Sequence, residues 1–415
     1  LAHTTMSCCK VGLSPIPKFF LFVPKSFENQ TEYQRWLPLN EVFNILAGGF
    51  ITARDHFVIS VDQHELTDRI ETFVNSTVSD NEIRETFFKG MGSRKYPDGD
   101  SRGWKLPIAR GLLRADPNRS NHIQKCLYRP FDVRWIYWAK EMIDWPRPEV
   151  NGHLLNEGNL GLVFMRQVAS GDSYSHFLVS RMPADNRACY SNKGIMSLAP
   201  LYLYSDTNDG NGELVFEHGC KRSNFSRKFY QAFQEALPAN SGIKPTAELV
   251  FHYLYAVLNS ATYRSRYEEM LKIDFPRIPI TTHRNCFNGL AKLGDELVAF
   301  HLFESPLIEN LITNVIGSRH FQVEKVSYSN NTVWIDKAKS HGFRGVSEEV
   351  WKFHIGGYQV CEKWLKDRGP KKGNPGRVLT EEDLNHYQKI VVALNETIRI
   401  MKEIDEVIEE HGGWP

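Results

Sequence analysis

Eleven residues in the first half of the chain constrain its fold more than any other stretch. Residues 128–138 read Tyr-Arg-Pro-Phe-Asp-Val-Arg-Trp-Ile-Tyr-Trp and combine two arginines and one aspartate with five aromatic rings. Neither an ordinary core strand nor an ordinary helix is built from this mixture. Pro130 favours an extended backbone at Arg129 and interrupts any strand ladder. The segment is therefore expected to be extended and broken at the proline.

Two interpretations of residues 128–138 stay open. Strand alternation after the proline gives two faces, with Arg134, Ile136 and Trp138 on one and Trp135 and Tyr137 on the other. In the structural interpretation, Asp132 pairs with Arg129 or Arg134 and the rings fill an interior. In the functional one, Arg129 or Arg134 contacts DNA, because guanidinium groups bond guanine edges and phosphates and rings stack on bases. The large ring area favours a scaffold that orients neighbouring loops.

The composition leaves nucleic-acid binding open. The chain has 415 residues, 41% of them hydrophobic, which suffices for a large core and predicts two to three domains. Its 50 basic and 49 acidic residues balance, so DNA binding requires a local basic face. Seven cysteines, an odd number, favour free thiols in a reducing cytoplasm. No apolar run approaches the ~20 residues of a membrane span, and no signal peptide is recognisable, so no membrane partner is expected.

The hydrophobic spacing changes twice along the chain. An apolar run at residues 19–23, between two prolines, predicts a buried strand. Helical spacing follows at residues 65–88, interrupted by a cap signal at Ser79. The middle of the chain is strand-like, with short β-prone runs at residues 160–168, 175–181 and 200–205. A polar, Gly-rich loop is expected at residues 207–219.

The last third returns to helical spacing. Helices are predicted at residues 249–258 and 290–303, and a further one opens at the glycine pair 356–357. A capping box at Thr380 begins a long final helix with apolar residues at alternating steps of three and four.

Most catalytic motifs are absent from the sequence. Gly90 and Gly92 come nearest to a dinucleotide-binding fingerprint but lack its third glycine and its preceding strand. No phosphate-binding loop ends in Gly-Lys-Ser or Gly-Lys-Thr, and no Cys or His pairs have zinc spacing. No Pro-Pro dipeptide occurs, so the motif with which amino-methylating DNA enzymes hold a flipped base is missing. For a nuclease, only residues 323–326 are suggestive, and a solvated hairpin explains them better. No catalytic residue and no metal site are predicted.

Polar residues in expected loops are better candidates for reading DNA than the aromatic segment itself. Arginine can bond guanine bidentately, and asparagine or glutamine can bond adenine. A basic stretch at residues 221–228 could contact phosphates, although a solvated face explains it slightly better. With the two arginines of the aromatic segment, the candidate DNA-binding residues are Arg129, Arg134, Arg147, Arg166, Gln167, Arg181, Asn186, Arg187, Lys221, Arg222, Asn224, Arg227 and Lys228.

Several stretches, in this order, resemble one known family. They are residues 51–55, 128–138, 200–204, 253–258, 263–267, 273–279 and 355–360, together with the closing helix. The chain is similar, from about residue 19 to 408, to the C-terminal target-recognition region of Type ISP restriction–modification enzymes. The resemblance implies that residues 1–50 are the exit of a methyltransferase, that 51–245 form a β-rich DNA target-recognition core and that 246–415 form a helical support. The nuclease, ATPase and methyltransferase motifs of such enzymes are not in this sequence.

These expectations combine into one prediction. The fold is α+β, with a mixed β-rich core and a helical C-terminal support. The resemblance implies sequence-specific recognition of double-stranded DNA, presenting a target adenine to a methyltransferase region of the same or a companion polypeptide. The alternative is a structural docking module that holds such a partner without reading bases. No cofactor is expected in this chain, and S-adenosylmethionine, ATP and Mg are implied only for a full-length enzyme. The expected localisation is cytoplasmic, and the leucine at position 1 suggests a fragment.

Overall fold

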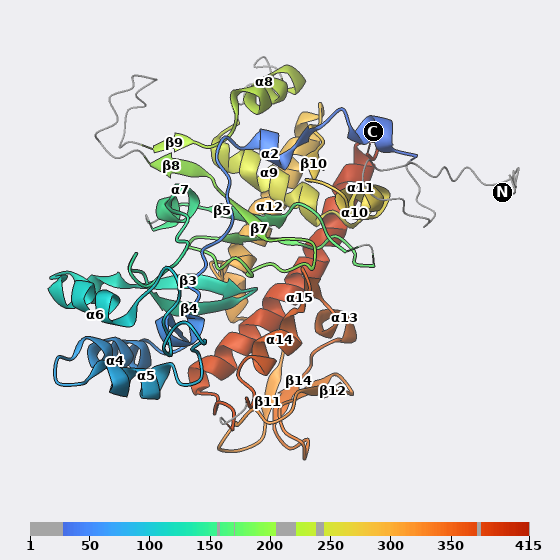
Figure 1. The fold of residues 1–415 in the computed structure, drawn as a ribbon. Helices are drawn as coiled ribbons and strands as arrows, with labels where there is room; N and C mark the ends of the chain where they lie inside the picture. The colour runs from blue at the N-terminus through green and yellow to red at the C-terminus, as the bar shows by residue number, and fades with distance from the viewer. Residues whose placement is uncertain are drawn as a thin grey trace, which may run out of the picture.

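The structure, a computed structural model, describes residues 28–155, 158–169, 171–204, 221–237, 245–371 and 375–414. Within them the fold is α+β, as predicted, with helices around several small antiparallel sheets (Figure 1). The predicted strand at residues 19–23 and the predicted loop at 207–219 lie outside the described residues. No helix in the described part is long and apolar enough to cross a membrane.

A unit between residues 50 and 143 has its own hydrophobic core. Its elements are α3 (Asp55–Val58), β2 (Ile59–Ser60), α4 (Gln63–Val74), α5 (Asp80–Phe87), α6 (Leu106–Ala115), β3 (Ile123–Arg129) and β4 (Asp132–Tyr137). The three strands form one sheet in the order β2-β4-β3. The side chains of Ser79 and Glu82 each accept a hydrogen bond from the other's backbone N–H, so the predicted cap begins α5.

A second sheet lies in the larger core. Its strands are β6 (Phe177–Ser180), β5 (Gly161–Met165) and β7 (Met196–Pro200), paired in that order. Every residue of β5 and β6 is buried, which is why these runs are apolar without alternation. Around this sheet lie α7 (Pro148–Asn151), β8 (Tyr202–Tyr204), β9 (Lys221–Ser223) and α8 (Arg227–Ala236). In β8 only Leu203 is buried, so its side chain and those of the two flanking tyrosines point to opposite faces.

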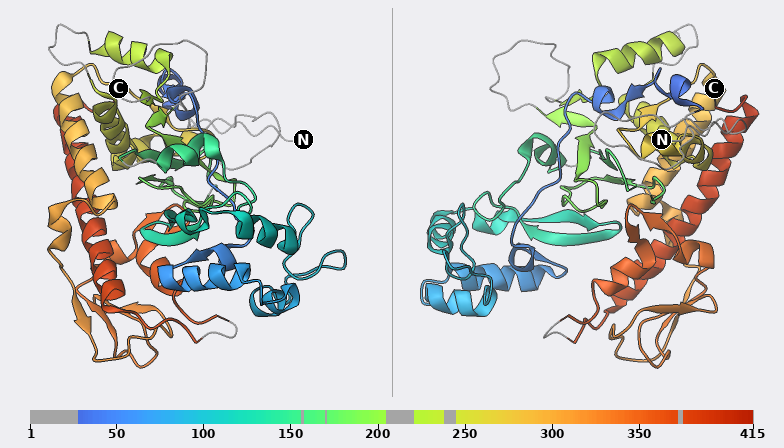
Figure 2. Two further views of the ribbon diagram at one scale, coloured as in Figure 1. Left: turned by 90° about the vertical axis from the view of Figure 1, so that its left-hand side faces the viewer. Right: turned by 45° about the vertical axis from the view of Figure 1, so that its right-hand side comes forward.

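Helices dominate the last third, as predicted. They are α9 (Ala247–Asn259), α10 (Ala261–Arg266), α11 (Glu268–Leu271), α12 (Arg284–His301), α13 (Glu348–Trp351), α14 (Val360–Lys366) and α15 (Glu381–Glu410). Thr380 and Asp383 form the predicted capping box of α15. α9 and α12 approach closely at Gly294, where a Cβ would lie 1.9 Å from the carbonyl oxygen of His252. Figure 2 shows α15 running beside α12 along the length of the molecule.

The N-terminal described segment docks on these helices. It comprises α1 (Gln30–Tyr33), β1 (Leu37–Pro38) and α2 (Leu39–Val42). β1 pairs with β10 (Arg277–Ile278), and the backbone N–H of Leu39 donates to the carbonyl of Pro276 at 2.9 Å. At this end of the molecule, backbone hydrogen bonds therefore join residues that are far apart in sequence.

A small sheet within the last third was not predicted. Its strands are β11 (Asn314–Ile316), β14 (Gly342–Arg344), β13 (Thr332–Trp334) and β12 (Ser327–Ser329), in that order. A two-stranded ladder of β15 (His354–Ile355) and β16 (Tyr358–Gln359) follows. Strands of two or three residues are too short for a period-two pattern to be recognised.

The hydrophobic cores divide the chain differently from the boundaries expected at residues 50 and 245. The smaller core ends at residue 143, and its elements contain more helical than strand residues. The larger core takes residues from the N-terminal segment, the β6-β5-β7 sheet and the C-terminal helices together. The middle sheet and the helical region are therefore packed as one body.

Candidate nucleic-acid interface

Residues 128–138 form a hairpin whose turn is Pro130-Phe131. β3 and β4 pair antiparallel, with Arg129 opposite Asp132 and an irregularity between Leu127 and Arg129. Phe131 adopts the left-handed conformation at φ 58°, which costs energy for a non-glycine residue. Its ring stacks on Phe303 with centroids 5.5 Å apart, so packing against the larger core compensates for the strained turn.

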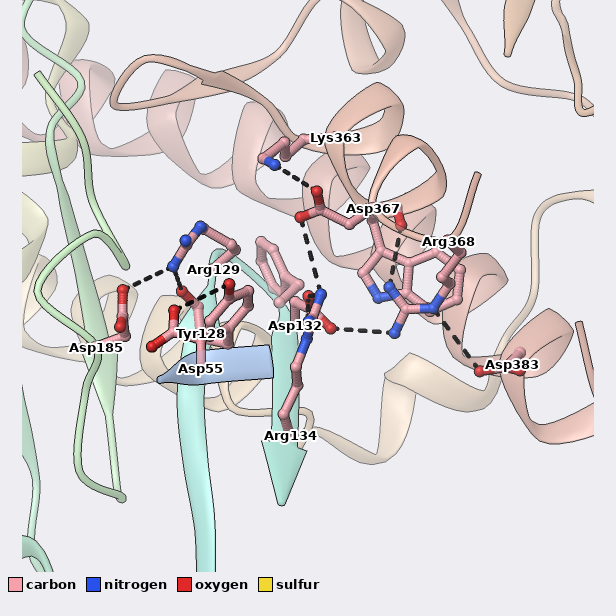
Figure 3. Close-up of polar contacts among 12 residues, drawn as sticks. Asp55, Tyr128, Arg129, Asp132, Arg134, Asp185, Lys363, Asp367, Arg368 and Asp383 are labelled. Carbon is pink, nitrogen blue, oxygen red and sulfur yellow. Dashed lines mark hydrogen bonds and ion pairs between the residues drawn. The ribbon is translucent and has the colours of Figure 1, made fainter. Parts of the chain in front are cut away.

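The hairpin carboxylate Asp132 is the centre of a buried ion-pair cluster (Figure 3). One oxygen accepts from Arg134 Nη2 at 2.6 Å, and the other accepts from Arg368 Nη2 at 3.0 Å, just beyond α14. The guanidinium of Arg368 also lies 3.4 Å from the centroid of Trp364. Burial raises the pKa of Asp132, but the charges of both arginines outweigh it and lower the pKa to about 2. The pairing of Asp132 with Arg134 confirms the structural interpretation of this pair.

Arg129 connects the hairpin to a loop 56 residues away. Its Nη1 donates to Asp185 Oδ1 at 2.7 Å, and the same oxygen accepts the backbone N–H of Arg187 at 2.9 Å. The backbone N–H of Asp185 donates to the carbonyl of Leu127 on β3 at 2.9 Å. Burial raises the pKa of Asp185 to about 6, with Arg129 opposing the shift, so the carboxylate is ionised at neutral pH. Arg129 therefore holds the loop at residues 185–190, called the 185–190 loop below.

The turn between β15 and β16 braces the 185–190 loop from the other side. Gly357 donates its backbone N–H to the carbonyl of Tyr190 at 2.9 Å, and the Tyr358 hydroxyl donates to the carbonyl of Arg187 at 3.0 Å. Gly356 has φ +59°, and a Cβ there would lie 2.8 Å from Cys189 Sγ. Two stretches that carry the family resemblance, residues 128–138 and 355–360, thus meet on this one loop.

A third segment joins the loop through Phe50-Ile51. Phe50 accepts the backbone N–H of Asn186 at 3.0 Å, and Ile51 exchanges backbone hydrogen bonds with Trp145 at 2.9 and 3.0 Å. The buried side chain of Asn151 donates to the carbonyl of Pro146 and accepts from the backbone N–H of Ala184, both at 3.0 Å. The 145–147 segment and the 185–190 loop are consequently neighbours.

Side chains on these two segments remain available to a ligand. Trp145 is 51% exposed and Tyr190 is 39% exposed, and the side chain of Arg187 is exposed without a side-chain partner in the described part of the chain. Asn186 is half-buried, and Arg147 lies 3.9 Å from Glu149 with 41% of its side chain exposed. The candidate interface is therefore the set Trp145, Arg147, Asn186, Arg187 and Tyr190.

Other predicted residues lie elsewhere and are engaged in local contacts. Arg166 pairs with Asp274 at 2.8 Å, and Arg181 pairs with Glu304 beyond α12. The Gln167 amide donates to the carbonyl of Lys193 at 2.9 Å. None of these contacts joins the three predicted residues to the 185–190 loop.

The four cations of the basic stretch 221–228 differ in whether they have a partner within the protein. Lys228 pairs with Glu41 at 2.6 Å, and Lys221 lies 4.1 Å from the ring centroid of Tyr202. Arg222 and Arg227 are exposed, with no ion-pair partner in the residues that the structure describes. The four cations lie over β9 and the start of α8, so a phosphate-contacting role stays a prediction.

Asn224 requires a correction. It is fully buried, and its amide donates to the carbonyls of Ile45 and Pro200 at 2.7 and 2.8 Å while its oxygen accepts from the backbone N–H of Ile45. In this conformation no polar atom of Asn224 is left for DNA. It is a scaffold residue, because a buried amide must satisfy its hydrogen bonds within the protein.

Sequence reasoning missed the residues that hold the interface. Asp185, Arg368 and Tyr358 were not singled out as site residues, and Trp145 and Tyr190 were not predicted to be exposed. The glycine pair 356–357 was the one available signal, because glycine permits both a positive φ and close backbone approach.

Comparisons with known proteins identify the family of this chain and its fold. Residues 41–403 match the Type ISP C-terminal specificity domain. No curated protein sequence matches the chain. Similar solved structures are the ATP-dependent Type ISP enzyme LlaBIII bound to DNA (18% identity, TM-score 0.62), a nuclease-deletion mutant of the Type ISP enzyme LlaGI with a DNA substrate mimic (16%, 0.60) and a DrdV–DNA complex (20%, 0.63).

The similarity extends over most of this chain but only part of each of those proteins. It covers 90%, 90% and 87% of this chain and 24%, 34% and 36% of LlaBIII, LlaGI and DrdV, respectively. At these identities the solved structures establish the shared fold. Because the family model matches far more than half of the chain, this protein belongs to the Type ISP C-terminal specificity domain family.

Proposed function

We propose that this chain recognises a short sequence in double-stranded DNA through the segments that carry Trp145, Arg147, Asn186, Arg187 and Tyr190. The observation that carries the proposal is the bracing of the 185–190 loop by Arg129 on one side and the Gly356-Gly357 turn on the other. A loop held from two sides presents its side chains in a fixed geometry, and a fixed geometry is what base recognition needs. Membership of a specificity-domain family and the DNA complexes of its structural neighbours support it.

The chemistry of the exposed side chains suits the major groove. The guanidinium of Arg187 can bond O6 and N7 of guanine, and the amide of Asn186 can bond N6 and N7 of adenine. Trp145 offers apolar surface for a thymine methyl group. Arg129 and Arg134, which the sequence placed among the candidate contacts, are both engaged with buried carboxylates. Arg129 orients the loop through Asp185, whereas Arg134 pairs with Asp132 within the hairpin.

We place this recognition within a larger Type ISP restriction–modification enzyme. There the domain presents a target adenine to a methyltransferase region of the same or a companion polypeptide, in the cytoplasm. S-adenosylmethionine, ATP and magnesium belong to the other regions of such an enzyme, and this chain contributes specificity to them.

Selection of bound duplexes from a randomised pool tests the proposal. The chain is expected to enrich one short sequence. Arg187→Ala is expected to weaken binding to that sequence by about 10- to 100-fold and to relax the preference at one position, the cost of losing one bidentate base contact. Lys89→Ala removes one exposed charge that is paired with Glu85 on α5, and is expected to leave the preference unchanged.

Two results would contradict the proposal. Binding that ignores sequence in a folded chain would leave the docking module as the remaining explanation. Equal effects of Arg187→Ala and Lys89→Ala would remove the 185–190 loop from the recognition surface.

A further inference from the structure

One end of the small β11-β14-β13-β12 sheet gathers two connections of the chain, residues 317–326 and 335–341. The antiparallel register places Ile316 opposite Gly342, Gly342 opposite Trp334 and Trp334 opposite Ser327. The segment after β11, the connection from β13 to β14 and the segment before β12 therefore emerge at the same end. In Figures 1 and 2 this sheet lies at the end of the molecule opposite β8 and β9.

Direct contacts hold these three segments together as one surface. The rings of Phe321 and His341 meet edge to face at 5.3 Å, and a Cβ on Gly317 would lie 2.3 Å from the His341 ring. The backbone N–H groups of Glu324 and Lys325 both donate to the carbonyl of Ile335, at 2.8 and 3.0 Å. The surface is therefore formed by tied loops, that is, loops that these contacts hold to one another.

This surface carries unbalanced positive charge. Residues 317–341 contain four Lys or Arg residues against two carboxylates. Arg319, Lys325 and Lys337 are exposed, and none has an ion-pair partner in the part of the chain that the structure describes. Lys339 lies nearby and donates to the Ser329 hydroxyl at 3.3 Å. Some exposed lysines elsewhere are paired with carboxylates, as Lys366 is with Glu362 at 2.9 Å.

The buried carboxylate of this surface, Asp336, forms no ion pair with Arg319, Lys325 or Lys337 in the described part of the chain. Asp336 accepts from the backbone N–H of Ser340 at 3.0 Å and from the Ser340 hydroxyl at 2.5 Å, and it lies 3.2 Å from His341 Nδ1. Burial raises the pKa of Asp336, but these hydrogen bonds outweigh it and lower the pKa to about 2. Its role is to fix the loop between β13 and β14. Glu324 is the other acid, and it is exposed.

The backbone at this end is strained. Gly317, Arg319 and His320 have φ of +108°, +61° and +50° within four residues. Left-handed non-glycine residues cost energy, and such strain concentrates where a loop has a binding task. Here it occurs in the segment that bears Arg319, next to the lysine-bearing loops.

We propose that the loops bearing Arg319, Lys325 and Lys337 contact the phosphate backbone of duplex DNA, outside the base pairs read by the 185–190 loop. The inference rests on the proposed function. Three unpaired cations on tied loops suit a polyanion with regularly spaced charges, and the release of condensed counterions drives such binding. The contacts add affinity and position without sequence information.

The test compares two triple variants of the full chain with the unaltered protein. Arg319→Ala, Lys325→Ala and Lys337→Ala together remove the proposed contacts. The control removes three exposed lysines that lie beside carboxylates elsewhere, Lys89→Ala, Lys366→Ala and Lys402→Ala, for the same change in net charge. The probe is a duplex carrying the sequence enriched from the randomised pool, titrated over a range of salt concentrations.

The slope of log K against log salt is the decisive quantity. Each lost phosphate contact lowers its magnitude by about 0.9, so the first triple variant is expected to lose about 2 to 3 from the slope and the control close to none. The sequence preference is expected to survive, because phosphates carry no base identity.

Each other result has a distinct meaning. An unchanged slope in the first triple variant, with intact binding, overturns this inference and leaves the proposed function standing, with the surface then assigned to an acidic protein partner. Altered sequence preference overturns the assignment to phosphates. Absence of any duplex binding by the folded, unaltered chain overturns both proposals.

Discussion

Buried carboxylates pair with the arginines of residues 128–138 and hold them inside the protein. Asp132 lies between two guanidinium groups and has its pKa lowered to about 2, whereas burial against one guanidinium raises the pKa of Asp185 to about 6. In both cases the arginine holds a carboxylate inside the protein. The residue types that first indicate DNA contact thus form the internal framework, while Arg187 is left exposed.

Asp132→Asn tests this framework at one residue. Removing one partner of a buried ion-pair cluster is expected to lower the free energy of unfolding by roughly 3–5 kcal/mol at neutral pH. The folded pKa lies below the ordinary value of 3.8, so the stabilisation is present above that pH and is lost as the pH falls toward about 2. Urea unfolding across this range should show the difference from the unaltered protein shrinking. Glu348→Gln, which alters an exposed carboxylate, should leave stability nearly unchanged at every pH, and a pH-independent loss in Asp132→Asn would contradict the assignment.

Short elements position the interface as much as long ones do. The turn between the two-residue strands β15 and β16 contacts the 185–190 loop. At position 356, glycine is the only residue type that avoids both the cost of a left-handed backbone and a clash with the Cys189 sulfur. The β3–β4 hairpin supports the opposite side of the same loop. These turns hold the 185–190 loop from two sides.

Gly356→Ala is expected to disturb this support. A left-handed alanine costs about 1–2 kcal/mol by itself, and the added Cβ also meets Cys189 Sγ at 2.8 Å and the Tyr190 nitrogen at 3.2 Å. Gly90→Ala is the matched control, since Gly90 has φ +77° and no atom within 4 Å of its Cβ position. Thermal unfolding should show the larger loss in Gly356→Ala, and only that variant should lose DNA sequence preference. Equal behaviour of the two variants would show that the turn does not support the loop.

At the scale of the molecule, two hydrophobic cores are joined by buried ion pairs. The pair of Asp132 and Arg368 spans 236 residues and connects the smaller core to the C-terminal helices. The pair of Arg129 and Asp185 makes a second connection beside it. The two cores therefore have to assemble in one relative orientation for the interface to form.

Arg368→Met is expected to uncouple the two cores. Without its guanidinium, Asp132 keeps only the Arg134 side of the cluster, and the unit between residues 50 and 143 should unfold in a separate, earlier transition. Arg399→Met is the control, because Arg399 pairs with Glu296, Glu396 and Glu403 on α12 and α15, away from the smaller core. Urea unfolding monitored by tryptophan fluorescence and by circular dichroism should give non-coincident curves for Arg368→Met alone. A single coincident transition in that variant would contradict the coupling role.

The sequence by itself determined the α+β class, the caps at Ser79 and Thr380, the break of the extended segment at Pro130 and the family. These features depend on periodicities and hydrogen bonds that act over a few residues, or on motifs read in order. Only the tertiary structure decided which carboxylate each arginine meets, that Asn224 is buried, and that residues 128–138 and 355–360 meet on one loop. Partners separated by 56 and 236 residues are selected by packing of the whole chain, which local patterns do not encode.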